Sequence, residues 1–106
     1  MPKRASVVWT RPALDSLLDI ARHIRMDKPS AARRFAETVK AKVTRLQDFP
    51  DSGRLVPEFP NSGLRELIVG DYRVIYRVLT APARVQILTV RHGSWLLGAG
   101  FGEEHE

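Results

Sequence analysis

The sequence predicts an α+β fold of two layers, in which a pair of helices covers one face of an antiparallel sheet. Two observations lead to it. Residues 64–93 contain three short runs whose side chains alternate with a period of two, the pattern of half-buried strands. Residues 11–49 contain apolar side chains at the spacing of amphipathic helices. Because such helices must bury their apolar stripes against another element, the predicted order is β-α-α-β-β-β.

The first strand and the first helix are predicted from residues 6–26. Residues 6–10, SVVWT, form a short apolar run suited to a strand, which we expect to join the same sheet. Thr10 is placed to cap the following helix, and Pro12 is tolerated in a first helical turn. Leucine and isoleucine side chains at helical spacing then carry this helix to about Met26.

A second helix follows almost at once. We expect Asp27 to cap it and Pro29 to lie in its first turn. Its apolar stripe continues until the pair Phe49-Pro50 ends it, so the two helices form an antiparallel hairpin. Residues 51–63 are rich in proline, glycine and asparagine. We expect them to form a loop, and its length indicates a functional or packing role.

The three predicted strands at residues 64–69, 72–79 and 84–93 form a meander. Gly70-Asp71 supplies a tight turn between the first two. In the middle strand the tyrosines and valines alternate with four other side chains, Arg73, Ile75, Arg77 and Leu79. One face of the sheet is therefore expected to enter the core, and the other face is expected to present arginines.

Length and composition set the class of protein. The 106 residues predict a single domain over residues 1–106, with a core at residues 6–93 and a tail at residues 94–106. The chain has no cysteine, so disulfide bonds and thiolate metal sites are excluded and a reducing compartment is expected. No apolar run approaches a membrane span, and the N-terminus lacks the apolar region of a signal peptide. We therefore expect a cytoplasmic protein without membrane contact.

The tail carries four large apolar residues among its glycines, Trp95, Leu96, Leu97 and Phe101. Two interpretations remain open. Either the tail folds back on the core, or these side chains stay exposed and mark a docking site for another chain.

The body of the chain is strongly basic. The net charge is +5, but three of the 12 acidic residues lie among the last four positions, so residues 1–102 carry 17 cations against nine anions. This excess of +8 favours an anionic partner, either nucleic acid or an acidic protein segment. Solubility alone is the alternative explanation.

Four arginines of the predicted sheet are candidates for binding an anion, Arg65, Arg73, Arg77 and Arg91. Arg73 and Arg77 share one face, and the other two can join them from neighbouring strands, depending on the strand register. Guanidinium groups on one face bind phosphate in a bidentate manner. In the alternative interpretation these arginines face solvent or pair with Glu66 and Asp71.

Histidine provides the other candidate chemistry. His92 follows Arg91 and can act as a general acid or base, although a hydrogen-bonding role at the end of the strand is equally consistent. His23 shares a helix face with Asp19 and Asp27, but a third strong ligand is missing, so we expect no metal. Phosphate-binding glycine loops and nucleophile elbows are absent, so we expect no cofactor. Cleavage of RNA by its own 2′-hydroxyl is one reaction that the remaining groups support.

The sequence resembles the RelE/ParE toxins of bacterial type II toxin-antitoxin systems over residues 7–93. The resemblance rests on five segments in the family's order and spacing: VVWTRPALDSLLDIARHI, DKPSAARRF, FPDSGR, LRELIVGDYRVIYRV and TVRHG. It implies the fold predicted above. It also implies a small toxin that a cognate antitoxin, encoded beside it, holds inactive.

The ParE branch is similar to this chain through GDYRVIYRV and RHG. Its members inhibit DNA gyrase without known catalytic groups, so the resemblance implies a gyrase inhibitor that is not an enzyme. The target is then expected to contact the side chains of the sheet, Arg65, Arg73, Arg77, Arg91 and His92. We expect the substitution Arg73→Glu to weaken toxicity and to leave the fold intact.

The alternative is the RelE branch, which cleaves messenger RNA on the ribosome without a metal. It implies catalytic roles for Arg73, Arg91 and His92. Leu67 and Val69 stand where that branch has lysines, and no tyrosine follows Arg91, which favours the ParE branch. A DNA-binding regulator is a third alternative, but the chain lacks a helix-turn-helix pattern.

The resemblance also implies a DNA-binding antitoxin similar to ParD and a hetero-oligomer of toxin and antitoxin. A C-terminal segment of the antitoxin is expected to wrap across the helical hairpin and the sheet. We expect it to contact four apolar side chains, Leu14, Leu18, Trp95 and Leu96. An acidic amphipathic segment suits this surface because it gains both apolar burial and charge complementarity.

Overall fold

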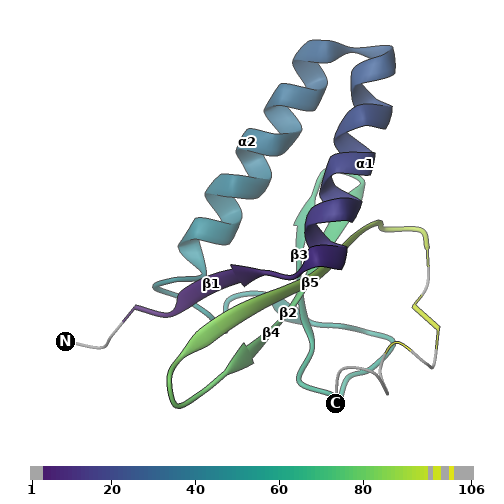
Figure 1. Ribbon diagram of the computed structural model, residues 1–106. Coiled ribbons are helices and arrows are strands. Elements are labelled where there is room, and N and C mark those ends of the chain that lie inside the picture. The colour runs from purple at the N-terminus through teal and green to yellow at the C-terminus, as the bar shows by residue number, and fades with distance from the viewer. Residues whose placement is uncertain (1–3, 96, 99–100, 102–106) are drawn as a thin grey trace.

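The computed structural model describes residues 4–95, 97, 98 and 101. Its elements are β1 (Ser6–Trp9), α1 (Arg11–Asp27), α2 (Pro29–Arg45), β2 (Arg54–Leu55), β3 (Arg65–Val69), β4 (Tyr72–Leu79) and β5 (Arg84–His92). The five strands form one sheet in the order β1-β5-β4-β3-β2. Figure 1 shows the two helices rising together as a hairpin from one side of this sheet. The predicted α+β architecture and the place of the first strand in the sheet are therefore confirmed.

The sheet is antiparallel except at one edge. β3, β4 and β5 form the predicted meander, and the short strand β2 pairs with the outer edge of β3. β1 pairs with β5 in parallel, from Ser6 opposite Arg84 to Trp9 opposite Ile87. Beyond Ile87 the chain has turned into α1, so the second half of β5 has a helix rather than a strand as its neighbour on that side.

The helix boundaries follow local chemistry, with two differences from the prediction. Thr10 caps α1 as expected, because its side-chain oxygen accepts a hydrogen bond from the Ala13 amide at 3.3 Å. Asp27 does not cap α2: it belongs to α1, and Lys28 is the residue between the helices. Pro29 explains this, since a residue before proline is driven to extended backbone angles, and Lys28 has φ −154° and ψ 102°.

The second helix ends earlier than predicted. α2 stops at Arg45 rather than at Phe49, and residues 46–48 form tighter turns. In these turns the amides of Leu46, Gln47 and Asp48 each bond the carbonyl three residues back, at 3.0 to 3.2 Å. The apolar spacing continues through this segment because its turns are nearly helical, which is why the pattern alone placed the end too late.

The first core lies between the helices and the sheet face that they cover, which we call the helix face. Its buried members include Phe35, Val39, Val43, Val74, Tyr76, Val85, Ile87 and Val90. Tyr76 is fully buried, and its hydroxyl donates to the Pro50 carbonyl at 2.9 Å and accepts from the Gly53 amide at 2.8 Å. These two bonds fix the chain that follows α2. Burial raises the pKa of this hydroxyl.

The opposite face of the sheet, which we call the far face, is not the open surface that the alternation predicted. A second buried cluster covers it, made of Val56, Leu64, Ile75, Leu88 and Leu97, with Phe59 and Phe101 packed against it. Val56 and Leu64 come from the long loop before β3, which contains the unpredicted strand β2. Leu97 shows that the tail folds back here, as one of the two interpretations expected. The loop therefore has a packing role.

Candidate functional site

The register of the strands divides the predicted site residues between the two faces of the sheet. Residues that face each other across neighbouring strands lie on the same side of a sheet. Arg73 is opposite Arg91, so these two lie on the far face. His92 is opposite Tyr72, whose ring packs on Phe35 of α2, so His92 lies on the helix face.

A β-bulge in β5 produces this division. Ile75 is opposite Thr89, whereas Tyr76 is opposite Ile87, so Leu88 is an extra residue in β5. The extra residue shifts the alternation of side chains by one for the rest of the strand, which places Arg91 on the far face and His92 on the helix face. Without the bulge, the alternation along β5 would place Arg91 on the face of Ile87.

Two other predicted arginines are placed by the same register. Arg65 is opposite Tyr76, so it lies on the helix face and does not join Arg73. There its Nη1 donates to the Gly53 carbonyl at 2.8 Å. Arg77 is on the far face opposite Gln86, and its Nε donates to the Gln86 side chain at 2.6 Å. Three of the four arginines, Arg73, Arg77 and Arg91, thus lie on the same face of the sheet.

Arg73 is buried, with only 5% of its side chain exposed. Both of its terminal nitrogens bind the Glu58 carboxylate, at 2.9 and 2.6 Å, and Nη1 also donates to Glu66 at 3.1 Å. The Glu66 side chain is fully buried, and its second oxygen accepts from Arg54 at 2.5 Å. The alternative that the strand arginines pair with Glu66 therefore holds for Arg73, while the expectation of an exposed Arg73 is wrong.

The electrostatics of this group follow from the bidentate contact. The Arg73 guanidinium lowers the pKa of Glu58 to about 2, mainly through the side-chain hydrogen bonds. In return, the hydrogen bonds that Arg73 donates to the Glu58 carboxylate raise the pKa of Arg73. Both side chains stay charged across the physiological pH range.

The same ion pair holds the beginning of the tail. Arg73 Nη2 donates to the Trp95 carbonyl at 2.6 Å, and the Leu97 amide donates to Glu58 at 2.9 Å. Sequence reasoning missed Glu58 because it lies in the loop before β3, where no periodicity marks a residue as buried. We call Arg73, Glu58 and Glu66 the ion-pair hub.

His92 has well-defined neighbours. Its ring meets Tyr72 edge to face, with the centroids 5.3 Å apart. Its Nδ1 lies 2.7 Å from the Ser94 hydroxyl and accepts from the Ser94 amide at 3.1 Å. These contacts satisfy the expectation of a hydrogen-bonding histidine at the end of the strand.

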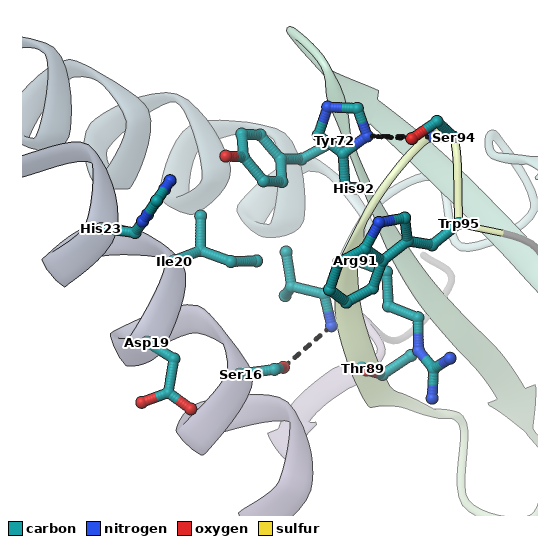
Figure 2. Close-up of a pocket in the computed structure, with 11 residues that line it drawn as sticks. Ser16, Asp19, Ile20, His23, Tyr72, Thr89, Arg91, His92, Ser94 and Trp95 are labelled. Carbon is teal, nitrogen blue, oxygen red and sulfur yellow. Dashed lines mark hydrogen bonds between the residues drawn. The ribbon is translucent and has the colours of Figure 1, made fainter.

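A cleft of about 720 Å³ lies beside His92, between α1 and the second half of β5. We call it the α1–β5 cleft. Ser16, Ile20 and His23 line it from α1, and Tyr72, His92 and Trp95 line it from the sheet and the following turn. Figure 2 shows these two walls facing each other, with the Arg91 guanidinium directed away from the His92 ring.

A second, more apolar groove of about 380 Å³ lies between the two helices beside β1. We call it the hairpin groove. It is lined by Val7, Trp9, Leu14, Leu17, Val39 and Val43, together with the charged side chain of Lys40. Leu14 is 43% exposed, and Leu18, one helical turn further on, is 45% exposed. Trp95, 67% exposed, lies in the other cleft, and Leu96 is outside the described residues.

Two further features concern metals and membranes. Among residues 4–95, 97, 98 and 101, no three histidine, cysteine or acidic side chains gather in a way that would hold a metal ion. Neither of the two described helices is long and apolar enough to cross a membrane.

Comparison with known families identifies the chain. The family model of the ParE toxin of type II toxin-antitoxin systems, parDE, matches residues 7–96. The chain belongs to the ParE toxin family. The match covers the hairpin, the sheet and the turn that ends at Trp95, which confirms the resemblance to RelE/ParE toxins.

Individual members of the superfamily agree. The chain is 38% identical to the toxin RelE2 of Caulobacter vibrioides over 92 residues, which are 87% of this chain and 99% of that protein. A chain of the chromosomal ParDE system of P. aeruginosa has a TM-score of 0.65 and 26% identity, covering 84% of this chain and 96% of that one. A chain of the RelBE2 complex of Mycobacterium tuberculosis has a TM-score of 0.60 and 23% identity, covering 84% and 98%.

Proposed function

We propose that this type II toxin acts by binding and inhibiting DNA gyrase, and that it does not cleave RNA. The observation that carries the proposal is the placement of the three side chains on which RNA cleavage would depend, Arg73, Arg91 and His92. One of them is buried in an ion pair, and the other two point to opposite faces of the sheet.

Arg73 is unsuited to stabilising a phosphorane. A cation assists phosphate cleavage only if its N–H groups point at the charge that develops on the phosphate oxygens. Both terminal nitrogens of Arg73 donate to Glu58, and they also bond Glu66 and the Trp95 carbonyl. The two carboxylates already neutralise its charge, so an RNA phosphate would have to displace buried ion pairs to reach it.

Arg91 and His92 are unsuited to acting on one phosphate. A general acid or base must come within about 3 Å of the proton that it transfers. Arg91 extends on the far face, where its guanidinium lies 5.3 Å from the centre of the Phe101 ring. The His92 ring lies on the helix face beside Tyr72. Both residues line the α1–β5 cleft, but the Arg91 guanidinium and the His92 ring are directed to opposite faces of the sheet.

A gyrase-binding surface does not require these groups to converge. We propose that it includes Arg77 and Arg91 on the far face and His92 at the end of β5. Arg73 does not contact the target in this proposal. It supports the surface indirectly, because the ion-pair hub holds the start of the tail through the Trp95 carbonyl and the Leu97 amide. The basic charge of residues 1–102 promotes the encounter with an acidic partner surface.

A cognate antitoxin is the second partner of the proposed function, and we propose that it binds the hairpin groove. The groove is apolar and is lined by the exposed Leu14 and by Lys40, and Leu18, which is also exposed, follows Leu14 by one turn of α1. An acidic amphipathic segment buries its apolar side chains there and pairs its carboxylates with the basic rim. The related structure from P. aeruginosa is of a ParDE toxin-antitoxin system, which supports such a partner.

The runner-up is a RelE-like ribonuclease that acts on messenger RNA at the ribosome. Its support is that Arg91 and His92 both line the α1–β5 cleft and that the relative from Caulobacter is named RelE2. This function requires a rearrangement that brings the two side chains onto one phosphate.

Titration of the purified toxin against purified gyrase tests the proposed surface. We expect the double variant Arg77→Glu, Arg91→Glu to weaken binding by at least about tenfold, the size of a lost interface anchor. Arg22→Glu is the matched control, because Arg22 is an exposed cation on α1, pairing only loosely with Asp19 at 3.5 Å. Equal affinities of the double variant and the wild type would reject this surface, and absence of gyrase binding would reject the proposed function.

A further inference from the structure

The α1–β5 cleft has a firmly held wall. The backbone of Trp95 is fixed from both sides: its amide donates to the His92 carbonyl at 3.0 Å, and its carbonyl accepts from Arg73 Nη2 at 2.6 Å. The indole is nevertheless 67% exposed. The desolvation cost of a buried ion pair can exceed its Coulombic gain, so stability alone is a weak reason for the ion-pair hub. Holding Trp95 beside this cleft is a second role for the hub.

The other walls are fixed in the same way. The His92 ring is held by Ser94 and by the edge of Tyr72. On the opposite side, the Ser16 hydroxyl accepts from the Val90 amide at 3.0 Å and donates to the Ala13 carbonyl at 2.9 Å. The cleft exists because β1 ends opposite Ile87, so the second half of β5 pairs with β4 on one side and has no strand on the other. A preformed cleft of about 720 Å³ is in the size range of small-molecule sites.

The side chains around the cleft define the ligand chemistry. Tyr72, His92 and Trp95 give one wall three aromatic rings, while His23 and Asp19 of α1 provide hydrogen-bonding groups on the other wall. A flat ligand with a polar edge satisfies both walls at once. A nucleobase has this shape, and stacking on an exposed aromatic side chain is the usual way in which proteins hold an unpaired base. The basic body of the chain favours the phosphate attached to it.

We propose that the α1–β5 cleft binds a purine base, stacked on Trp95 with its polar edge toward His23 and Asp19. A free purine nucleotide and a base in a single-stranded nucleic acid both supply this chemistry. A purine is favoured over a pyrimidine because its larger ring system covers more of the indole. The cleft shares Arg91 and His92 with the proposed gyrase-binding surface, but its ligand is different, and binding is tested without gyrase.

Tryptophan fluorescence measures this binding directly. The variant Trp9→Phe leaves Trp95 as the single tryptophan, since the chain has two. Titration with adenosine monophosphate is expected to quench Trp95 to saturation in the sub-millimolar range, and cytidine monophosphate to bind more weakly. Ribose 5-phosphate, which lacks the base, is expected to give no quenching. His23→Ala removes a hydrogen-bonding group and should weaken adenosine monophosphate binding by up to about tenfold. Met26→Ala changes a residue of the same helix that is 85% exposed, and it should leave the affinity unchanged.

The two sources of the base are distinguished by a short adenine oligonucleotide. Affinity for the oligonucleotide within twofold of the mononucleotide indicates a free nucleotide, and a much tighter oligonucleotide indicates a single strand; both support the site. Absence of saturable quenching by every nucleotide overturns it. The proposal is also wrong if ribose 5-phosphate binds as tightly as adenosine monophosphate, or if His23→Ala does not change the affinity for adenosine monophosphate. Binding of adenosine monophosphate to Trp95→Ala with wild-type affinity, measured by calorimetry, would overturn it as well. Saturation by an acidic peptide alone would show that the cleft takes a protein side chain and that the proposal is wrong.

Discussion

Arg73 binds Glu58 through both of its terminal nitrogens, at 2.9 and 2.6 Å, across the loop that covers the far face of the sheet. This contact joins three parts of the chain: the strand β4, the loop before β3, and the tail through the Trp95 carbonyl and the Leu97 amide. An arginine that alternation places on an open surface is therefore the centre of a buried polar group. The main role of Arg73 is therefore structural: it holds these three parts of the chain together.

The first prediction concerns stability. Arg73→Ala should lower the free energy of unfolding by about 3 kcal/mol or more, because it leaves the fully buried Glu66 with Arg54 as its one remaining ion-pair partner among the described residues. Urea unfolding followed by circular dichroism measures the loss. Arg77→Ala is the matched control on the same strand and face, and it should cost less than about 1 kcal/mol. A loss at Arg73 no larger than that at Arg77 would contradict a structural role for Arg73.

The same reasoning replaces the expectation that Arg73→Glu leaves the fold intact. That substitution places three carboxylates together with only the Arg54 guanidinium left to pair with them, at a site where Arg73 is 4% exposed. We expect the variant to be less stable than Arg73→Ala in the same urea experiment. Its loss of toxicity, if observed, would then report unfolding rather than a lost target contact. Wild-type stability of Arg73→Glu would exclude this explanation.

The second prediction concerns pH. The pKa of Glu58 falls from 4.5 to about 2 on folding, so the folded state binds this proton less readily than the unfolded state. The pair therefore adds stability above pH 4.5 that disappears as the pH falls toward 2, an effect of up to about 3 kcal/mol. Glu58→Gln should flatten the decline in urea midpoint between about pH 6 and pH 3.

The control for this experiment is Asp48→Asn. Asp48 pairs with Arg4 at 3.0 Å, but both side chains are more than half exposed, so this pair is screened by solvent. We expect Asp48→Asn to keep the pH dependence of the wild type. If Glu58→Gln also keeps it, Glu58 does not control acid stability.

The third prediction concerns the Tyr76 hydroxyl. Tyr76→Phe leaves the Gly53 amide and the Pro50 carbonyl without their partner and should cost about 1–3 kcal/mol. Hydrogen exchange at the Gly53 amide should also become faster, since that amide loses its acceptor. Tyr72→Phe is the matched control and should change stability by less than about 0.5 kcal/mol. Equal effects of the two changes would mean that the buried bonds of Tyr76 carry little energy.

The fourth prediction concerns the antitoxin. Leu14→Glu with Leu18→Glu puts one negative charge in the hairpin groove and a second one helical turn away, and should weaken binding of an acidic antitoxin segment by about thirtyfold or more. Calorimetry with the cognate antitoxin measures the change. Both leucines are over 40% exposed, so the fold should tolerate the substitutions. Met26→Glu, a change at a residue that is 85% exposed, is the control and should bind the antitoxin like the wild type. Wild-type affinity of the double variant would mean that the antitoxin binds another surface.

Local rules account for what the sequence predicts correctly. The Thr10 cap, the Gly70-Asp71 turn and the three strands of the meander depend on neighbours a few residues apart. The hairpin was predictable because its apolar stripes repeat over two long helices. Even Lys28 had a local signal, since the proline after it disfavours helical angles at that residue.

The site depends on relationships that are not local. The extra residue at Leu88 reverses the faces of Arg91 and His92, and no feature of the alternation marks it. Val56 and Glu58 reach the far face from a loop without periodicity, so the burial of Arg73 could not be seen from β4 alone. Both errors arise from tertiary contacts that override a regular strand pattern.

The most direct test of the gyrase proposal uses one preparation of purified toxin in two assays. Supercoiling by DNA gyrase and cleavage of messenger RNA on programmed ribosomes are measured over the same toxin concentrations. We predict that supercoiling is inhibited and that the RNA stays intact. Cleaved RNA with unaffected gyrase would contradict the proposal, and it would require Arg91 and His92 to converge on one phosphate in the ribosome-bound state.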